Sequence, residues 1–121
     1  MTLDTSVVLG LLRASDAHHR AAVDILGKHL DSTKLLPASA YAEILVRAIR
    51  TGTVAEIDAF VDDMGADVVP ADRRIARRAA ALRAEHRSLR LPDALVLATA
   101  HERATELITF DKRLQRVRDS R

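Results

Sequence analysis

Two aspartates stand directly after strand-like segments near opposite ends of the 121-residue chain. Asp4 follows Leu3 in "MTLDTS", and Asp111 ends the β-favouring run 107–110 in "LITFDKRL". The carboxyl ends of parallel strands share one edge of a sheet, where α/β proteins collect functional groups. The two carboxylates could therefore meet at one site, although each could instead cap the helix that follows it.

Two further acids also have both a functional and a structural interpretation. Asp93 follows Pro92, where a carboxylate in a first helical turn offsets the macrodipole by about 0.3–1 kcal/mol. Glu43 precedes Arg47 by four residues, an order that favours a surface ion pair worth about 0.2–0.5 kcal/mol. The neighbours of Glu43 in "YAEILV" are unusually apolar for a solvated acid, which weakens the ion-pair interpretation.

The composition indicates one folded domain, residues 1–121, with an aliphatic core. Hydrophobic residues make up 48%, aromatic residues 2% and charged residues 30% of the chain, so global disorder is not expected. The absence of cysteine excludes disulfides, thiolate metal sites and a cysteine nucleophile. No signal peptide is expected, because the N-terminus carries Asp4 and Gly10 and lacks a basic start before a long apolar run. No membrane span is expected either, because the most apolar stretch, 94–100, is far too short. We therefore expect a cytoplasmic protein without a membrane partner.

The basic residues are mostly arginine and are unevenly distributed. Sixteen of the 19 basic residues are arginine, and seven of them lie between residues 73 and 90 with one acid, Glu85. A second basic group, Lys112, Arg113, Arg116, Arg118 and Arg121, closes the chain. Arginine suits phosphate because its planar group donates paired hydrogen bonds. A solvated helix face would give the same pattern.

Hydrophobic periodicity predicts short strands that alternate with helices. We expect strands at 1–3, 34–36, 67–69 and 107–110. We expect helices at 6–12, 17–30 (capped by Asp16), 38–50, 53–64, 72–86 and 91–104 (with Pro92 at the first position), and a helix-compatible stretch after Asp111. Strands joined by helical crossovers cannot form hairpins, so the fold class is α/β with a mostly parallel sheet and helices on both faces.

Four motifs, taken together and in order, resemble those of the PIN-domain family. They are "LDTS", "AEILVRA", "LPDALVLATA" and "TFDKRL", and the similarity is greatest to the VapC-type toxins, the ribonucleases of bacterial toxin–antitoxin pairs. The resemblance covers essentially the whole chain and implies a PIN-like three-layer α/β/α domain with a small central sheet. The first strand is shorter than the family pattern, and Leu114 stands where an aromatic residue is common. Neither departure removes an acid.

The resemblance also implies a site and its chemistry. The catalytic, metal-binding quartet of the family falls on Asp4, Glu43, Asp93 and Asp111, and the supporting hydroxyl groups fall on Thr5 or Ser6 and on Thr109. Carboxylate oxygens suit Mg²⁺ or Mn²⁺, and a bound metal can activate the water that attacks phosphorus. We therefore predict a metal-dependent endoribonuclease. The residues expected to bind RNA are Arg73, Arg77, Arg87, Arg90, Lys112 and Arg113.

The resemblance also implies partners, and two other classes of function remain. The resemblance implies a homodimer, a VapB-type antitoxin that blocks the acidic pocket, and structured RNA such as tRNA or rRNA as target. A haloacid-dehalogenase-like phosphatase would need a second aspartate where Ser6 stands, and a receiver would need one at the end of "KLLPAS". A non-catalytic module that binds nucleic acid or protein through its arginines remains the third possibility.

Overall fold

The structure is a computed structural model that describes residues 1–120. Arg121, which the sequence places in the second basic group, lies outside the described residues. The described strands form one four-stranded sheet in the order β3-β2-β1-β4, and every pairing is parallel. The strands are β1 (Thr2–Leu3), β2 (Lys34–Pro37), β3 (Ala66–Val69) and β4 (Leu107–Ile108). The predicted parallel sheet is confirmed.

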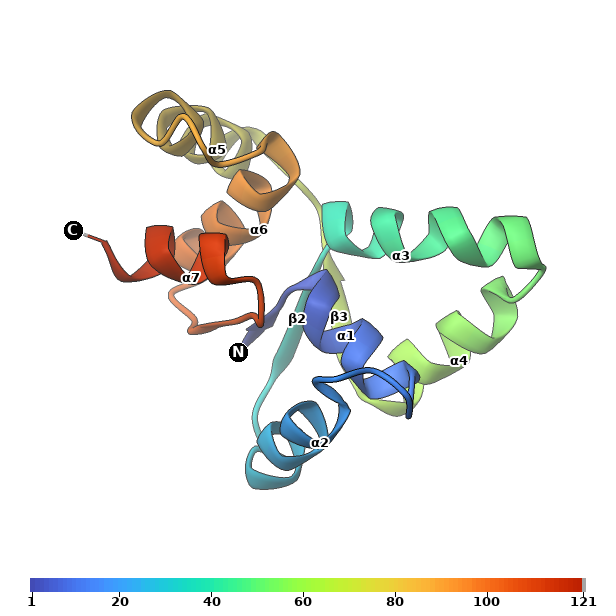
Figure 1. Cartoon of the computed structure of the whole chain (residues 1–121). Coiled ribbons are helices and arrows are strands. Elements are labelled where there is room, and N and C mark those ends of the chain that lie inside the picture. The colour runs from blue at the N-terminus through green and yellow to red at the C-terminus, as the bar shows by residue number, and fades with distance from the viewer. Residues whose placement is uncertain (121) are drawn as a thin grey trace.

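Seven helices in residues 1–120 connect and cover this sheet. They are α1 (Thr5–Leu12), α2 (His19–Lys28), α3 (Ala38–Thr51), α4 (Val54–Asp63), α5 (Arg73–Glu85), α6 (Leu91–Glu102) and α7 (Lys112–Asp119). Figure 1 shows α5, α6 and α7 on one side of the sheet and the first four helices on the other. The predicted three-layer α/β/α arrangement is confirmed. None of these described helices combines the length and the apolar character needed to cross a bilayer.

The topology places the end of β1 inside the sheet rather than at its margin. β1 pairs with β2 through Thr2 and Leu35, and with β4 through Leu3 and Ile108. The chain therefore leaves β1 at Asp4 beside the point where it leaves β4. This adjacency, which the sequence allowed but did not establish, brings together two segments more than 100 residues apart.

The core is aliphatic, as the composition predicts. Its fully buried side chains come mainly from β1, β2, α1 and α6, and the largest include Leu3, Leu36, Leu97, Leu107, Val7, Val8 and Val96. α6 is the most deeply buried helix, since residues 96–100 are all buried together with Asp93 and Ala94. A helix held by the core on several sides gives Asp93, in its first turn, a rigid support.

The second helix begins later than predicted. It starts at His19 rather than at residue 17, and it ends at Lys28 rather than at residue 30. The Asp16 Oδ1 atom accepts a hydrogen bond from the backbone N–H of His18 at 2.8 Å, which makes a tight turn before the helix. His18 occupies the N-cap position, so the predicted Asp16 cap is wrong. Pro92 is also the second residue of α6 rather than the first.

The last strand is shorter than predicted because the backbone after Ile108 forms hydrogen bonds with side-chain hydroxyl groups rather than with a neighbouring strand. β4 ends at Ile108, and the backbone N–H of Phe110 then donates to Ser6 Oγ at 3.0 Å. The N–H of Asp111 donates to Thr109 Oγ1, also at 3.0 Å. The segment 109–111 is therefore held by hydroxyl groups rather than by a neighbouring strand.

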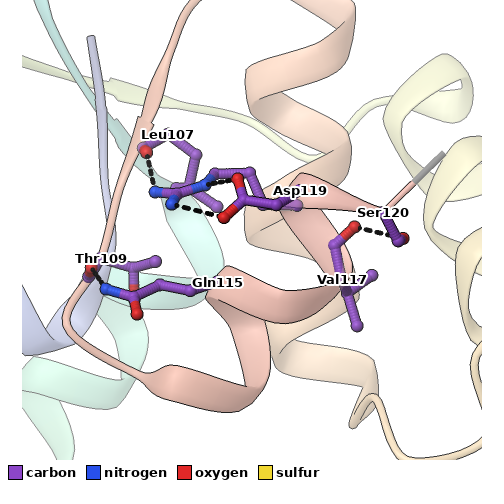
Figure 2. Close-up of polar contacts among 7 residues, drawn as sticks. Leu107, Thr109, Gln115, Val117, Asp119 and Ser120 are labelled. Atoms are coloured by element: carbon purple, nitrogen blue, oxygen red, sulfur yellow. Dashed lines mark hydrogen bonds and ion pairs between the residues drawn. The ribbon is translucent and has the colours of Figure 1, made fainter.

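Helix α7 is fastened to β4 and to the segment that follows it. The side-chain amide of Gln115 donates to the carbonyl of Thr109 at 2.7 Å, and Arg118 donates to the carbonyl of Leu107 at 3.0 Å. Figure 2 shows both bonds, together with the paired contact between Arg118 and Asp119. These bonds satisfy carbonyl groups at the open edge of the sheet, and they fix the direction in which Asp111 leaves it.

Candidate functional site

Asp4 lies at the carboxyl end of β1 and is almost completely buried, with 6% of its surface exposed. Its Oδ2 atom accepts two hydrogen bonds, from Ser6 Oγ at 2.9 Å and from Thr109 Oγ1 at 2.7 Å. It occupies the N-cap position of α1 but makes no side-chain capping bond there. The capping interpretation of the Asp4 side chain is therefore wrong. Two hydroxyl groups orient this carboxylate instead.

Asp111 has the structural role that the sequence allowed. It is the N-cap of α7, and its Oδ1 atom accepts a hydrogen bond from the backbone N–H of Leu114 at 3.0 Å. Its negative charge nevertheless extends to α6, because it contributes to the raised pKa of Asp93. Capping and participation in an acidic site are therefore compatible for this residue.

Asp93 lies in the first turn of α6 with 7% of its surface exposed. Burial raises the pKa of its carboxyl group, and the negative charges of Asp4 and Asp111 raise it further. Arg90 opposes this effect from the N-cap position, with Nε 3.4 Å from Asp93 Oδ2. The single arginine does not cancel the combined effect of burial and repulsion.

Glu43 projects from α3 toward the other acids. The residue as a whole is exposed. The partial burial of its carboxyl group is nevertheless the largest cause of a raised pKa, and the negative charges of Asp93 and Asp4 raise this pKa further. A hydrogen bond from Thr5 and the charge of Arg90 act in the opposite direction. No ion pair between Glu43 and Arg47 is present in the described residues, so the surface-pair interpretation is wrong.

The hydroxyl groups divide between two acids. Ser6 and Thr109 both serve Asp4 Oδ2, and their own oxygens lie 3.4 Å apart. Thr5 affects Glu43 instead, because it acts to lower the pKa of that carboxyl group. The sequence left Thr5 and Ser6 as alternatives, and of these two it is Ser6 that donates a hydrogen bond to Asp4.

The four acids thus influence one another across three elements and the segment after β4. Within residues 1–120, no three of them stand close enough to form a ready-made metal-binding group. The chemistry of the donor set nevertheless fits a hard divalent cation, because it consists of carboxylate oxygens whose mutual repulsion Arg90 offsets only in part. The side chains that could hold such an ion are those of Asp4, Glu43, Asp93 and Asp111.

The arginine-rich stretch extends away from this site. Arg78 on α5 pairs with Glu102 at the end of α6, at 3.6 Å between Nε and Oε1. The two helices are therefore antiparallel, and the first half of α5 lies beside the end of α6 remote from Asp93. Arg73 and Arg77 belong to that remote half. Arg87 and Arg90 lie in the α5–α6 connection near the start of α6, whereas Lys112 and Arg113 follow Asp111 at the start of α7.

An open cavity of about 590 Å³ adjoins Glu43 and Thr5. It lies among α1, α3 and α4, and its apolar lining includes Leu9, Leu12 and Ile44. Its basic and hydroxyl side chains are Arg13, Arg47, Thr51 and Thr53. Sequence reasoning missed this feature.

Comparison with known proteins decides the family. A model of the PIN domain matches residues 1–120. The chain belongs to the PIN-domain family. The resemblance seen in the four sequence motifs is thereby confirmed, and the receiver and phosphatase alternatives find no support. Among curated proteins, none matches the chain closely enough to count as a relative.

Several solved structures superpose over nearly the whole chain. A toxin–antitoxin complex from Klebsiella pneumoniae is 27% identical, with a TM-score of 0.76, over 91% of this chain and 85% of that one. The Mycobacterium tuberculosis toxin VapC20, described as cleaving the sarcin–ricin loop, is 17% identical, with a TM-score of 0.77, over 95% and 92%. VapBC2 from Rickettsia felis, bound to a promoter DNA fragment, is 14% identical, with a TM-score of 0.75, over 96% and 91%.

We predict that Asp93→Asn makes the metal-free protein more stable than the wild type at neutral pH. The pKa of Asp93 is raised on folding, so its ionised form destabilises the native state above the folded pKa. That cost disappears as the pH falls through the folded pKa toward the ordinary value of 3.8. The gain in melting temperature should therefore be largest at neutral pH and should shrink on acidification. Thermal melts from about pH 4 to about pH 8 measure it.

Glu43→Gln should change stability in the same direction, because the pKa of Glu43 is also raised. Asp24→Asn is the matched control, since Asp24 is exposed on α2 and should leave the pH profile unchanged. An Asp93→Asn variant that melts at or below the wild-type temperature at neutral pH would contradict the repulsion among these acids.

Proposed function

We propose that this PIN domain is the toxin of a toxin–antitoxin pair, acting as an endoribonuclease that depends on Mg²⁺ or Mn²⁺. The observation that carries the proposal is the grouping of four carboxylates beside the ends of β1 and β4, where burial and then the charges of neighbouring acids raise the pKa values of Glu43 and Asp93. A structural ion pair lowers the pKa of its carboxyl group, whereas burial beside other acids raises it, and a bound cation would offset that cost. The toxin and the toxin–antitoxin complexes among the superposing structures support the toxin role.

The acids would divide the work according to their surroundings. Asp4 Oδ2 already accepts two hydroxyl hydrogen bonds, so its Oδ1 atom is the oxygen left to a cation. Asp93 is held rigidly by α6, and Asp111 Oδ1 is engaged by the α7 backbone, which leaves its other oxygen. Glu43 is the most exposed acid and is the best placed to meet water or RNA. A bound Mg²⁺ or Mn²⁺ would supply charge neutralisation and an acidified water.

The substrate we propose is structured RNA, such as tRNA or rRNA. Arg87, Arg90, Lys112 and Arg113 are exposed and flank the acids from two sides, where they could hold the backbone phosphates on either side of the cleaved bond. Arg90 also offsets the charge of Asp93, so RNA binding and neutralisation of the acids would be coupled through this side chain.

A cognate VapB-type antitoxin is the proposed inhibitor. The cavity beside Glu43 has an apolar floor and the basic side chains Arg13 and Arg47, which suits an extended peptide segment with apolar and acidic residues. A segment seated there would also obstruct the acids. We further propose a homodimer, supported by the exposed apolar residues Val46 and Ile49 on α3, which are 52% and 67% exposed.

Cleavage should depend on the acids and on divalent metal. Asp4→Asn or Asp93→Asn should lower Mn²⁺-dependent cleavage of a tRNA and rRNA mixture by roughly a hundredfold or more, the usual effect of removing one preorganised electrostatic interaction from an active site. The circular dichroism spectrum should stay native. The Asp24→Asn control should cleave at the wild-type rate. Full activity in both acid variants, or undiminished wild-type activity in EDTA, would refute the proposal.

RNA affinity should depend on salt through the basic residues near the acids. Replacing Arg87 and Lys112 by glutamine should flatten the slope of log affinity against log salt by about 1.4, or about 0.7 for each phosphate of single-stranded RNA that is no longer neutralised. Replacing Arg73 and Arg77 should change the slope little, because they lie beside the remote end of α6. The slopes come from fluorescence anisotropy in EDTA at several salt concentrations. A larger effect of the second pair would place the RNA across α5 instead.

A further inference from the structure

A stacked pair of rings stands beside the acidic site and takes no part in holding the metal or the phosphates. His18 and Phe110 lie face to face, with ring centroids 4.7 Å apart and planes inclined by 10°. The chain has only two phenylalanines, one tyrosine and no tryptophan, so one of three such rings is used in this contact. All three rings pack against the core, and Tyr41 also donates a hydrogen bond to Asp58, but only Phe110 is stacked on another ring in the described residues.

The backbone connects this pair directly to the acids. Phe110 stands between Thr109, which donates to Asp4, and Asp111. The N–H of Phe110 donates to Ser6 Oγ, and that same hydroxyl group donates to Asp4 Oδ2. The position of Phe110 is therefore fixed relative to the carboxylates by two consecutive hydrogen bonds.

The His18 ring is not needed to hold its own turn. The backbone of His18 makes the local hydrogen bonds: its N–H donates to Asp16 Oδ1, and its carbonyl accepts from the N–H of Ala22. The neighbouring His19 ties the turn to α1, with Nδ1 2.7 Å from the carbonyl of Gly10. His18 makes no side-chain capping bond to α2 and is exposed. One face of its ring rests on Phe110, and the residue's exposure leaves the other side to solvent.

We propose that the His18–Phe110 pair is a stacking subsite for one unpaired nucleobase of the RNA substrate. This inference rests on the proposed ribonuclease function and adds to it a contact with a base rather than with phosphate. Flat rings accept any base by stacking, which single-stranded RNA recognition uses widely. Phe110 supports the imidazole from behind, so the ring is already oriented before RNA arrives. An unpaired base next to the acids would place its own phosphate at the cleavage site.

The test separates base stacking from attraction to phosphate. The probes are a labelled 10-mer of adenylate and a 10-mer of abasic ribose phosphate with the same charge, and binding is measured in EDTA. Wild-type protein should bind the adenylate probe about fivefold or more tightly than the abasic probe, which corresponds to the lower end of measured stacking contributions. His18→Ala should remove most of this difference by weakening adenylate binding alone. His18→Tyr should retain it, because a flat ring remains.

His29→Ala is the matched control, since His29 is an exposed histidine at the other end of α2, and it should bind both probes like the wild type. Equal affinity of the wild type for the two probes, or equal weakening of both by His18→Ala, would overturn the inference; the latter, with a lowered melting temperature, would make the pair a structural contact. A loss of antitoxin binding without a change in RNA discrimination would overturn it in favour of a protein contact. Metal-dependent cleavage by the same proteins tests the ribonuclease function separately.

Discussion

Burial of carboxylates close to one another, beside the ends of β1 and β4, is the constraint on which the candidate site depends. Two unit charges about 4 Å apart repel by about 4 kcal/mol at an effective dielectric constant near 20, so four ionised carboxylates do not gather without help. In residues 1–120 they remain too dispersed to form a ready metal-binding group, yet they are close enough that their charges add to the effect of burial in raising the pKa values of Glu43 and Asp93. The fold holds them at this intermediate separation.

Each support for the acids is a different kind of interaction. The hydroxyl groups of Ser6 and Thr109 hold Asp4 across the junction of β1 and β4. The buried helix α6 holds Asp93, and the backbone of α7 holds Asp111. Helix α7 is itself fastened to β4 through Arg118 and to the segment after β4 through Gln115, so the position of Asp111 is tied to that of Asp4. Glu43, on the exposed face of α3, has the weakest support.

Much of the fold could be predicted from the sequence because it depends on local patterns. The alternation of apolar runs with segments of helical periodicity predicted every described strand. The end of α3 could be predicted because Gly52 adopts the left-handed conformation that favours glycine. The strand order and the bond between Thr109 and Asp4 could not be predicted from local patterns, because they join residues 105 positions apart. The Asp16 cap was wrong for a different, local reason: its carboxylate accepts a hydrogen bond from the backbone of His18, two residues away.

The candidate site was predicted less evenly than the fold. Residue types and spacing identified the acids, and family resemblance grouped them, but the role of each carboxylate depends on its partners in space. Asp4 and Asp111 occupy the same kind of strand-to-helix position in the sequence, and only Asp111 caps its helix with its side chain. In the sequence the arginines from 73 to 90 form one continuous basic segment. In the structure, the pair between Arg78 and Glu102 shows that the first half of this segment lies away from the acids. The contact between His18 and Phe110 had no sequence signal.

The most direct test of the central claim, that these repelling carboxylates form a cation site, is a thermal melt with and without Mn²⁺. Wild-type protein should be stabilised by about 2.7 kcal/mol when free Mn²⁺ exceeds its dissociation constant a hundredfold. Asp93→Asn should begin from a higher metal-free melting temperature and gain less from the ion. A wild-type melting temperature that Mn²⁺ leaves unchanged, together with no gain in metal-free stability for the variant, would contradict the claim.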